Sequence, residues 1–146
     1  MAIFGAGSNW DGLEKKNDFF RDENFVIGWN YSNAKDLYVA TAALKVGDII
    51  YLKANAPGSR QLRVKGIGIV TKNFMTSIID EDLTLSNFTT WKSLSIRVKW
   101  IVKSEFVIQI PNNEGRLTNI RAATFYEESL PTVQTSIILE ILNRMQ

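Results

Sequence analysis

The chain has 146 residues, no cysteine, no histidine and a formal net charge of +2. This length suits a single domain, residues 1–146, with a sizeable core, and the missing residue types exclude disulfide frameworks, zinc sites built on cysteine or histidine, and catalysis by either side chain. The first ten residues lack the pattern of a signal peptide, and no apolar run approaches the length that spans a membrane. We therefore expect a cytoplasmic protein with no membrane partner.

Charge is unevenly distributed along the chain. Residues 46–121 carry eleven basic and six acidic side chains, a net charge of +5, whereas residues 1–45 and 122–146 have net charges of −1 and −2. A basic sheet face is typical of a surface that meets phosphates. Lysine and arginine also serve simply to keep the outward face of a strand in water, so both interpretations remain open for each residue.

The N-terminal part predicts a short strand followed by two helices. Residues 2–4 are apolar and predict the strand, and residues 13–23 predict a short helix with Leu13 on the same side as its two phenylalanines. We expect the second helix to run from Ser32 or Asn33 to about Leu44, since Asn33 can accept hydrogen bonds from the amides of the first turn.

Residues 46–73 predict the two strands around which the chain is organised. Ile49–Leu52 would place apolar groups on both faces of an extended segment, which is typical of a strand covered on both sides. In the next strand, five residues recur at every second position: Leu62, Val64, Gly66, Gly68 and Val70. This spacing predicts one shared face, on which the two glycines leave space for a helix, an aromatic ring or a ligand.

The C-terminal half predicts two further strands and a closing helix. Residues 74–91 predict an irregular excursion with one short strand or turn, and the alternation over residues 94–102 predicts a half-buried strand. Residues 105–110 predict another strand, and residues 116–126 a loop with a short turn. Pro131 suits the first turn of a helix, because its missing N–H costs nothing there.

The summed pattern predicts an α+β fold. Strands dominate the middle of the chain without regular alternation of strand and helix, which argues against a doubly wound sheet. We expect a small curved sheet or partly open β-barrel flanked by about three helices.

The order and spacing of five motifs resemble the PUA-like superfamily: Trp10–Gly12, Ile27–Trp29, Leu44–Lys53, Val64–Val70 and Ile96–Trp100. Within that superfamily, the chain is most similar to the EVE-like modified-base sensing domain at the front of GTP-driven, modification-dependent restriction enzymes. The resemblance covers residues 3–101. No ATPase or GTPase module follows it, so the resemblance implies a stand-alone reader or the partner of a separate effector protein.

The resemblance implies a nucleic acid whose modified base is turned out of its stack into an aromatic-lined pocket. Trp10 and Trp29 are the expected walls, because the family places aromatics there and neither residue follows a core period; tryptophan also serves as a buried core residue. Asn9 and Asp11 can read the edge of a base. The cations that we expect to contact phosphate are Lys53, Arg63, Lys65, Arg97 and Lys99.

Three classes of function remain open. The first is a nucleic-acid-binding module in phage defence or counter-defence, with DNA favoured over RNA. The second is a sensor or sequestering protein for a free nucleotide or another small molecule. The third is an enzyme such as a magnesium-dependent nuclease, which needs converging carboxylates that the sequence does not show. Residues 80–82 suggest a hard-metal site, but consecutive carboxylates are typical of a solvated loop, and no second cluster has ligand spacing. We therefore predict a protein without enzymatic activity, with no catalytic residue, metal or cofactor.

Overall fold

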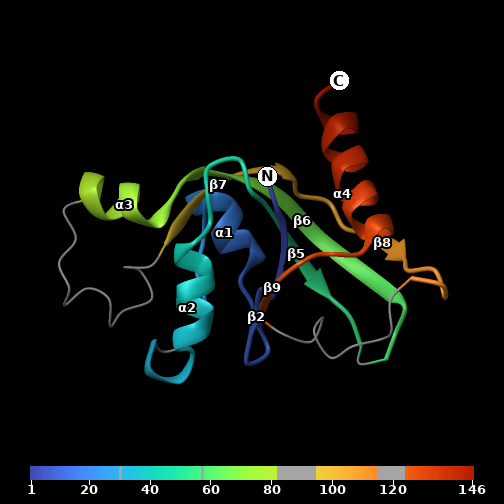
Figure 1. Cartoon of the computed structure of the whole chain (residues 1–146), viewed down its shortest axis with the longest axis horizontal. Coiled ribbons are helices and arrows are strands. Elements are labelled where there is room, and N and C mark those ends of the chain that lie inside the picture. Colours follow the sequence, from blue (N-terminus) through green and yellow to red (C-terminus); the bar gives the residue numbers. More distant parts are fainter. Residues whose placement is uncertain (30, 57, 82–94, 115–123) are drawn as a thin grey trace.

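A computed structural model describes residues 1–29, 31–56, 58–81, 95–114 and 124–146. These residues form a curved mixed β-sheet with four α-helices around it (Figure 1). The strands are β1 (Ile3–Ala6), β2 (Asn9–Trp10), β3 (Leu13–Glu14), β4 (Asn24–Phe25), β5 (Ile49–Ala54), β6 (Gln61–Lys72), β7 (Ile96–Val102), β8 (Phe106–Gln109) and β9 (Phe125–Glu127). The helices are α1 (Lys16–Asp22), the 3₁₀ turn η1 (Tyr31–Asn33), α2 (Lys35–Ala42), α3 (Phe74–Glu81) and α4 (Pro131–Arg144).

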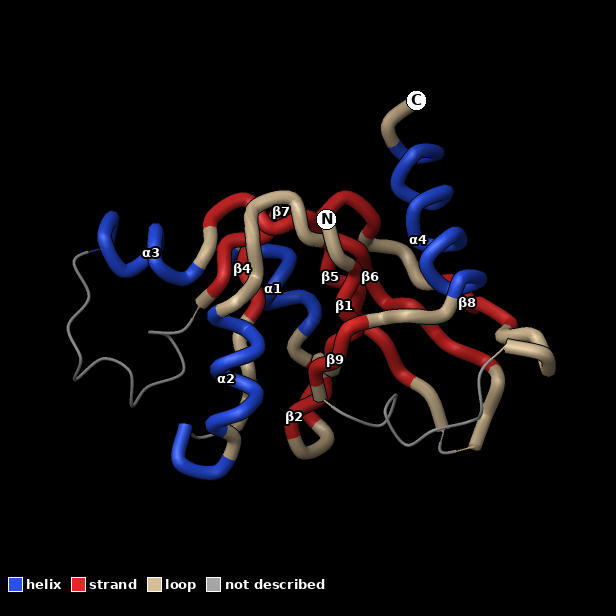
Figure 2. Tube along the Cα trace, viewed as in Figure 1, coloured by secondary structure: helices blue, strands red, loops and turns tan. Residues whose placement is uncertain are grey.

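The main sheet is built on the long strand β6. Its strand order is β4-β7-β6-β5-β1-β9, and β8 also pairs with β6, beyond the end of β7 (Figure 2). Strands β1 and β5 are parallel, and the other neighbours in this sheet are antiparallel. Residues 49–53 of β5 are buried, as expected for a strand that lies inside the sheet and is covered on both faces. The predicted α+β fold with a curved sheet is confirmed.

Each face of the sheet has its own hydrophobic core. Phe19 of α1 and Tyr38 of α2 pack with Ile50, Leu52 and neighbouring side chains on one face. On the other face, α4 contributes the buried stripe of Val133, Ile137 and Ile141. Figure 1 shows α1 and α2 on the opposite side of the sheet from α4. None of the helices in the described ranges is long and apolar enough to cross a bilayer.

A β-bulge overturns the predicted shared face of β6. Leu52 lies opposite Gly66 and Lys53 lies opposite Val64, so Lys65 is an extra residue in β6 and the alternation changes phase there. Leu62 and Val64 therefore face the core under α4, whereas Val70 faces the core under α1 and α2.

The gap at the two glycines of β6 is filled by aromatic rings, one of the three fillings that the sequence predicts. A Cβ atom at Gly66 would lie 2.6 Å from Cζ of Phe20. A Cβ atom at Gly68 would lie 2.8 Å from Cε3 of Trp100.

Three local predictions are wrong. Phe74–Glu81 is the helix α3 rather than an irregular segment, so the described chain has four α-helices instead of three. Phe125–Glu127 is a strand, because it pairs with β1. Asn33 does not cap α2, whose N-cap residue is Ala34 without a side-chain hydrogen bond.

Candidate functional site

A short hairpin after β1 carries one wall of the candidate site. Asp11 has φ 50° and Gly12 has φ 87°, which is typical of the two-residue type I′ turn that an Asp-Gly pair favours. The side chain of Asn9 stabilises the turn by accepting a hydrogen bond from the Gly12 amide at 2.8 Å. The resulting register pairs Asn9 with Glu14 and Trp10 with Leu13, so Leu13 is an exposed strand residue and not part of the helix.

The indole of Trp10 is seated between the hairpin and the backbone at Gly28. Its ring meets the edge of Phe19, with centroids 6.0 Å apart, and Nζ of Lys15 lies 5.0 Å from its centroid. A Cβ atom at Gly28 would lie 2.6 Å from two atoms of the indole, so a glycine is required for this close approach. Trp10 is consequently half-buried, with part of its ring left to solvent.

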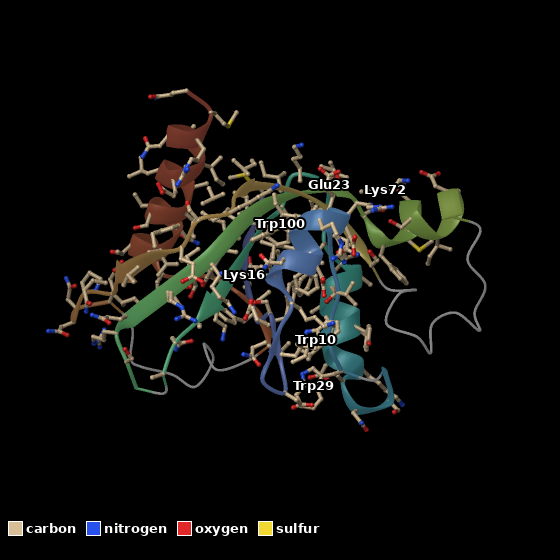
Figure 3. The ribbon with its side chains drawn as sticks, turned by 180° about the vertical axis from the view of Figure 1, so that it is seen from behind. Trp10, Lys16, Glu23, Trp29, Lys72 and Trp100 are labelled. Carbon is tan, nitrogen blue, oxygen red and sulfur yellow. The ribbon has the colours of Figure 1, made fainter. Side chains whose placement is uncertain are left out.

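Trp29 lies near Trp10. Hydrogen bonds of its indole N–H and its backbone carbonyl, rather than burial of its ring, fix its position. Its side chain is 51% exposed, and its indole N–H donates to Oγ1 of Thr124 at 3.1 Å. The hydroxyl of Tyr38 in α2 donates to the Trp29 carbonyl. Figure 3 shows the two indoles together at one end of the molecule.

The two tryptophans line one pocket with a volume of about 380 Å³, within the range of small-molecule sites. Its walls come from the ends of β1 and β5, the β2–β3 hairpin, the segment after β4, the bulged part of β6 and the residue before β9. The lining residues are Gly7, Ser8, Asn9, Trp10, Asp11, Glu14, Gly28, Trp29, Lys53, Ala54, Asn55, Arg63, Lys65 and Thr124.

A partly buried ion pair forms part of the pocket lining. Lys65, the bulge residue, is 2% exposed and donates to both carboxylate oxygens of Glu14, at 2.9 and 3.2 Å. Oγ of the buried Ser8 donates to Oε1 of Glu14 at 2.6 Å. Burial by itself would raise the pKa of Glu14, but the hydrogen bonds from Ser8 and Lys65 and the positive charge of Lys65 outweigh it and lower that pKa.

The cations around the pocket differ in how available they are to a phosphate. The charge of Lys65 is already matched by Glu14, so we reassign it from phosphate contact to support of the pocket. Lys53 is buried, with Nζ 5.6 Å from the ring centroid of Tyr126. Arg63 is the accessible cation of this group: its side chain is 54% exposed, and it lies 3.9 Å from Glu105.

Arg97 and Lys99 do not line the pocket. They lie on the exposed face of β7, where Arg97 donates to the Asp22 carbonyl at 3.0 Å and Lys99 lies 3.5 Å from Glu23. Of the nine residues that the sequence predicts for base and phosphate binding, seven line this pocket, and Arg97 and Lys99 lie on another surface.

The sequence interpretation missed four polar residues of the pocket: Ser8, Glu14, Asn55 and Thr124. A signal for Glu14 was present, because an Asp-Gly pair predicts a two-residue hairpin and thereby a register in which Glu14 faces Asn9. Thr124 and Asn55 reach the pocket only because strands far apart in the sequence pair with each other, and no local pattern reveals such pairings. Within the described part of the chain, the lining offers two indole surfaces, several hydrogen-bonding groups and one accessible cation.

Among the described residues, no three histidine, cysteine or carboxylate side chains cluster in a way that could hold a metal ion. Asp80 forms an ion pair with Lys72 at 2.7 Å. Asp82, the last of the three consecutive carboxylates, lies outside the described residues.

Comparison with known proteins shows the fold. A hypothetical protein from Leishmania major is similar with a TM-score of 0.54 at 12% sequence identity, over 100% of this chain and 98% of that chain. The YTH domain of the Zygosaccharomyces rouxii MRB1 protein, solved in complex with N6-methyladenosine RNA, is similar with a TM-score of 0.44 at 23% identity, over 96% of this chain and 86% of that chain. No protein-family model and no curated protein matches the sequence.

Proposed function

We propose that the chain is a non-catalytic nucleic-acid-binding module of the PUA-like, EVE-like kind, which holds a modified, flipped base in the pocket between Trp10 and Trp29. The observation that carries the proposal is that two tryptophans from separate segments line one pocket of suitable size. Stacking on an aromatic is worth about 1–3 kcal/mol per base, comparable to the few kcal/mol lost when a base leaves its stack. The exposed guanidinium of Arg63 lies where a phosphate beside the bound base can be met.

The resemblance to restriction-enzyme domains favours DNA over RNA and a role in phage defence or counter-defence, with a separate effector protein. This part of the proposal rests on sequence motifs alone. The partner test therefore includes both kinds of nucleic acid.

A free nucleotide or another small molecule is the second candidate ligand. The observation in its favour is the small number of accessible cations that the described residues place at the pocket, since Lys65 is paired with Glu14, and Arg97 and Lys99 lie elsewhere. A polymer ligand needs contacts to several phosphates, and its affinity would fall steeply with salt. A free nucleotide needs only one such contact.

A binding titration separates these candidates. Single-stranded and duplex DNA and RNA, each with and without base modifications, are titrated beside free nucleotides at two salt concentrations. We expect one modified oligonucleotide to bind best, and Trp29→Ala to weaken that binding by about 5- to 150-fold, the equivalent of one lost base stack. Trp29→Phe should retain most of the affinity.

The matched control is Leu139→Ala on α4, which removes a side chain of similar exposure outside the pocket. Its affinity should equal that of the unaltered protein. If Trp29→Ala folds normally and binds as well as this control, the pocket is not the binding site. Tight binding of free nucleotides with little binding of oligonucleotides would select the second candidate.

A further inference from the structure

The carboxylate of Glu14 is fixed in the pocket by its neighbours. It faces Asn9 across the hairpin, and its side chain is 34% exposed. Ser8 and Lys65 hold it from the protein side, and the amide of Lys16 donates to Oε1 at 3.3 Å. A group held by this many hydrogen bonds is pre-organised for recognition, because a ligand does not have to order it.

The two oxygens of Glu14 are unequally occupied. Oε1 accepts from Ser8, Lys65 and the Lys16 amide, whereas Oε2 accepts from Lys65 alone among the described residues. An ionised carboxylate has about four lone-pair sites on its two oxygens. Oε2 therefore retains the capacity to accept one more hydrogen bond. The lowered pKa of Glu14 keeps the group ionised, and therefore acceptor-only, at neutral pH.

Asn55 gives a second, independent indication of a missing donor. It lines the same pocket, and its Oδ1 is buried without a hydrogen-bond partner in the described structure. An unsatisfied buried acceptor costs about 1–3 kcal/mol and is rare in folded proteins. Because this oxygen has almost no accessible surface, a ligand N–H removes that cost once the Asn55 side chain turns it toward the pocket.

We propose, on the basis of the function proposed above, that Glu14 reads the edge of the bound base and that the pocket selects bases with an exocyclic amino group. An amine presents N–H donors to acceptor oxygens, as the cytosine amine does to carboxylates in DNA recognition. A base with a carbonyl at that position directs an oxygen at Oε2 of Glu14. Two acceptors then face each other, and neither obtains a hydrogen bond.

The experiment uses the best-binding oligonucleotide of the titration above and a copy whose base lacks the amine. The pairs are adenine with hypoxanthine, cytosine with uracil and guanine with hypoxanthine, with any other modification retained. We expect about 5- to 150-fold weaker binding of the copy, since one good base-edge contact is worth about 1–3 kcal/mol. Asn55→Asp, which makes that side chain an acceptor only, should preserve the preference.

Glu14→Gln tests the assignment to a residue. Its amide can donate to a carbonyl, so the preference for the amine should shrink or reverse. Because this variant leaves Lys65 without a counter-ion, the double variant Glu14→Gln/Lys65→Met is measured beside it, and both are checked by thermal unfolding. Glu140→Gln, the same chemical change on α4 outside the pocket lining, is the matched control and should keep the preference.

The outcomes separate the two proposals. If no oligonucleotide or nucleotide binds, or if binding does not depend on Trp29, the proposed function itself is overturned. Two outcomes overturn only the inference about Glu14. In the first, binding depends on Trp29 but the oligonucleotide with the amine and the copy without it bind equally; in the second, the best-binding base has no amine. An unchanged preference in folded Glu14→Gln has the same consequence.

Discussion

At the scale of single residues, Glu105 restrains two cations beside the pocket. It accepts a hydrogen bond from Lys16 at 2.6 Å and lies 3.9 Å from Arg63. Glu105→Gln would remove the negative charge and release both cations toward phosphate. We expect tighter oligonucleotide binding and a steeper dependence of log K on log salt, by about 0.7–0.9 for each added phosphate contact. The measurement is a series of titrations between low and physiological salt.

The control for this prediction is Glu140→Gln. Glu140 lies 3.8 Å from Arg144 within α4, and neither residue lines the pocket, so the salt slope should stay at the value of the unaltered protein. An equal slope in Glu105→Gln would mean that Lys16 and Arg63 do not meet the nucleic acid.

Sequence reasoning located the pocket residues best where local turn chemistry is distinctive. Trp10 stands in a run of turn-forming residues and Trp29 follows Gly28, and both line the pocket. The charged residues were harder to assign, because a strand pattern does not reveal which outward face meets a pocket. Lys99 therefore resembled Arg63 in sequence but lies on a different surface.

At the scale of elements, the bulge at Lys65 determines what β6 presents to each core. A strict two-residue period predicted one face, and a single inserted residue changed the phase midway. The parallel pairing of β1 with β5 was equally hidden, because it joins residues more than forty positions apart. The local alternation of β7 was read correctly for Ile96, Val98 and Trp100, which lie in one core. Val102 lies in the other core, because the pairing with β6 shifts between Trp100 and Val102.

At the position of Gly68, β6 has no room for a side chain. A Cβ atom there would contact Cγ1 of Val98 and lie 2.8 Å from Cε3 of Trp100 and 3.0 Å from the Lys99 carbonyl. Because the backbone oxygen cannot move away as a side chain can, Gly68→Ala should lower the free energy of unfolding by about 1–3 kcal/mol. Urea unfolding monitored by circular dichroism measures this change.

The control for Gly68→Ala is Gly7→Ala, whose Cβ would have no neighbour closer than 3.9 Å. Its stability should change by about 0.5 kcal/mol or less, or increase slightly. A double-mutant cycle with Val98→Ala should show positive coupling, since removing the Val98 methyls makes room for the new one. A Gly68→Ala protein as stable as the Gly7→Ala protein would contradict the packing argument.

At the scale of the whole molecule, a buried polar network joins the sheet to α4. The hydroxyl of Tyr51 donates to Oε1 of Glu128 at 2.6 Å and lies 2.8 Å from the hydroxyl of Tyr126. Oε2 of Glu128 accepts from the amides of Ser129 and Leu130, at 3.0 and 3.1 Å, just before α4 begins. The network therefore ties β5, β9 and the entry to α4 together beneath the core on that face.

This network makes the stability of the fold sensitive to alkaline pH. Burial, followed by the nearby charges of Tyr126 and Glu128, raises the pKa of Tyr51 above its ordinary value of 10.0. Above that ordinary value the unfolded chain releases the Tyr51 proton while the folded chain retains it. Below about pH 10 the contribution of this group to the free energy of unfolding is thus present in full and does not change with pH. It falls as the pH rises further, by at most about 1.4 kcal/mol per pH unit.

Tyr51→Phe should reveal this contribution in two ways. At neutral pH it should cost about 1–3 kcal/mol, because Glu128 loses a buried donor. Between pH 9 and 11 its unfolding free energy should fall less steeply than that of the unaltered protein. The variant lacks the Tyr51 hydroxyl, which titrates only in the unfolded chain, whereas all other titrating groups are the same in both proteins. Urea unfolding at each pH gives both slopes; equal slopes would show that Tyr51 does not hold its proton through the network.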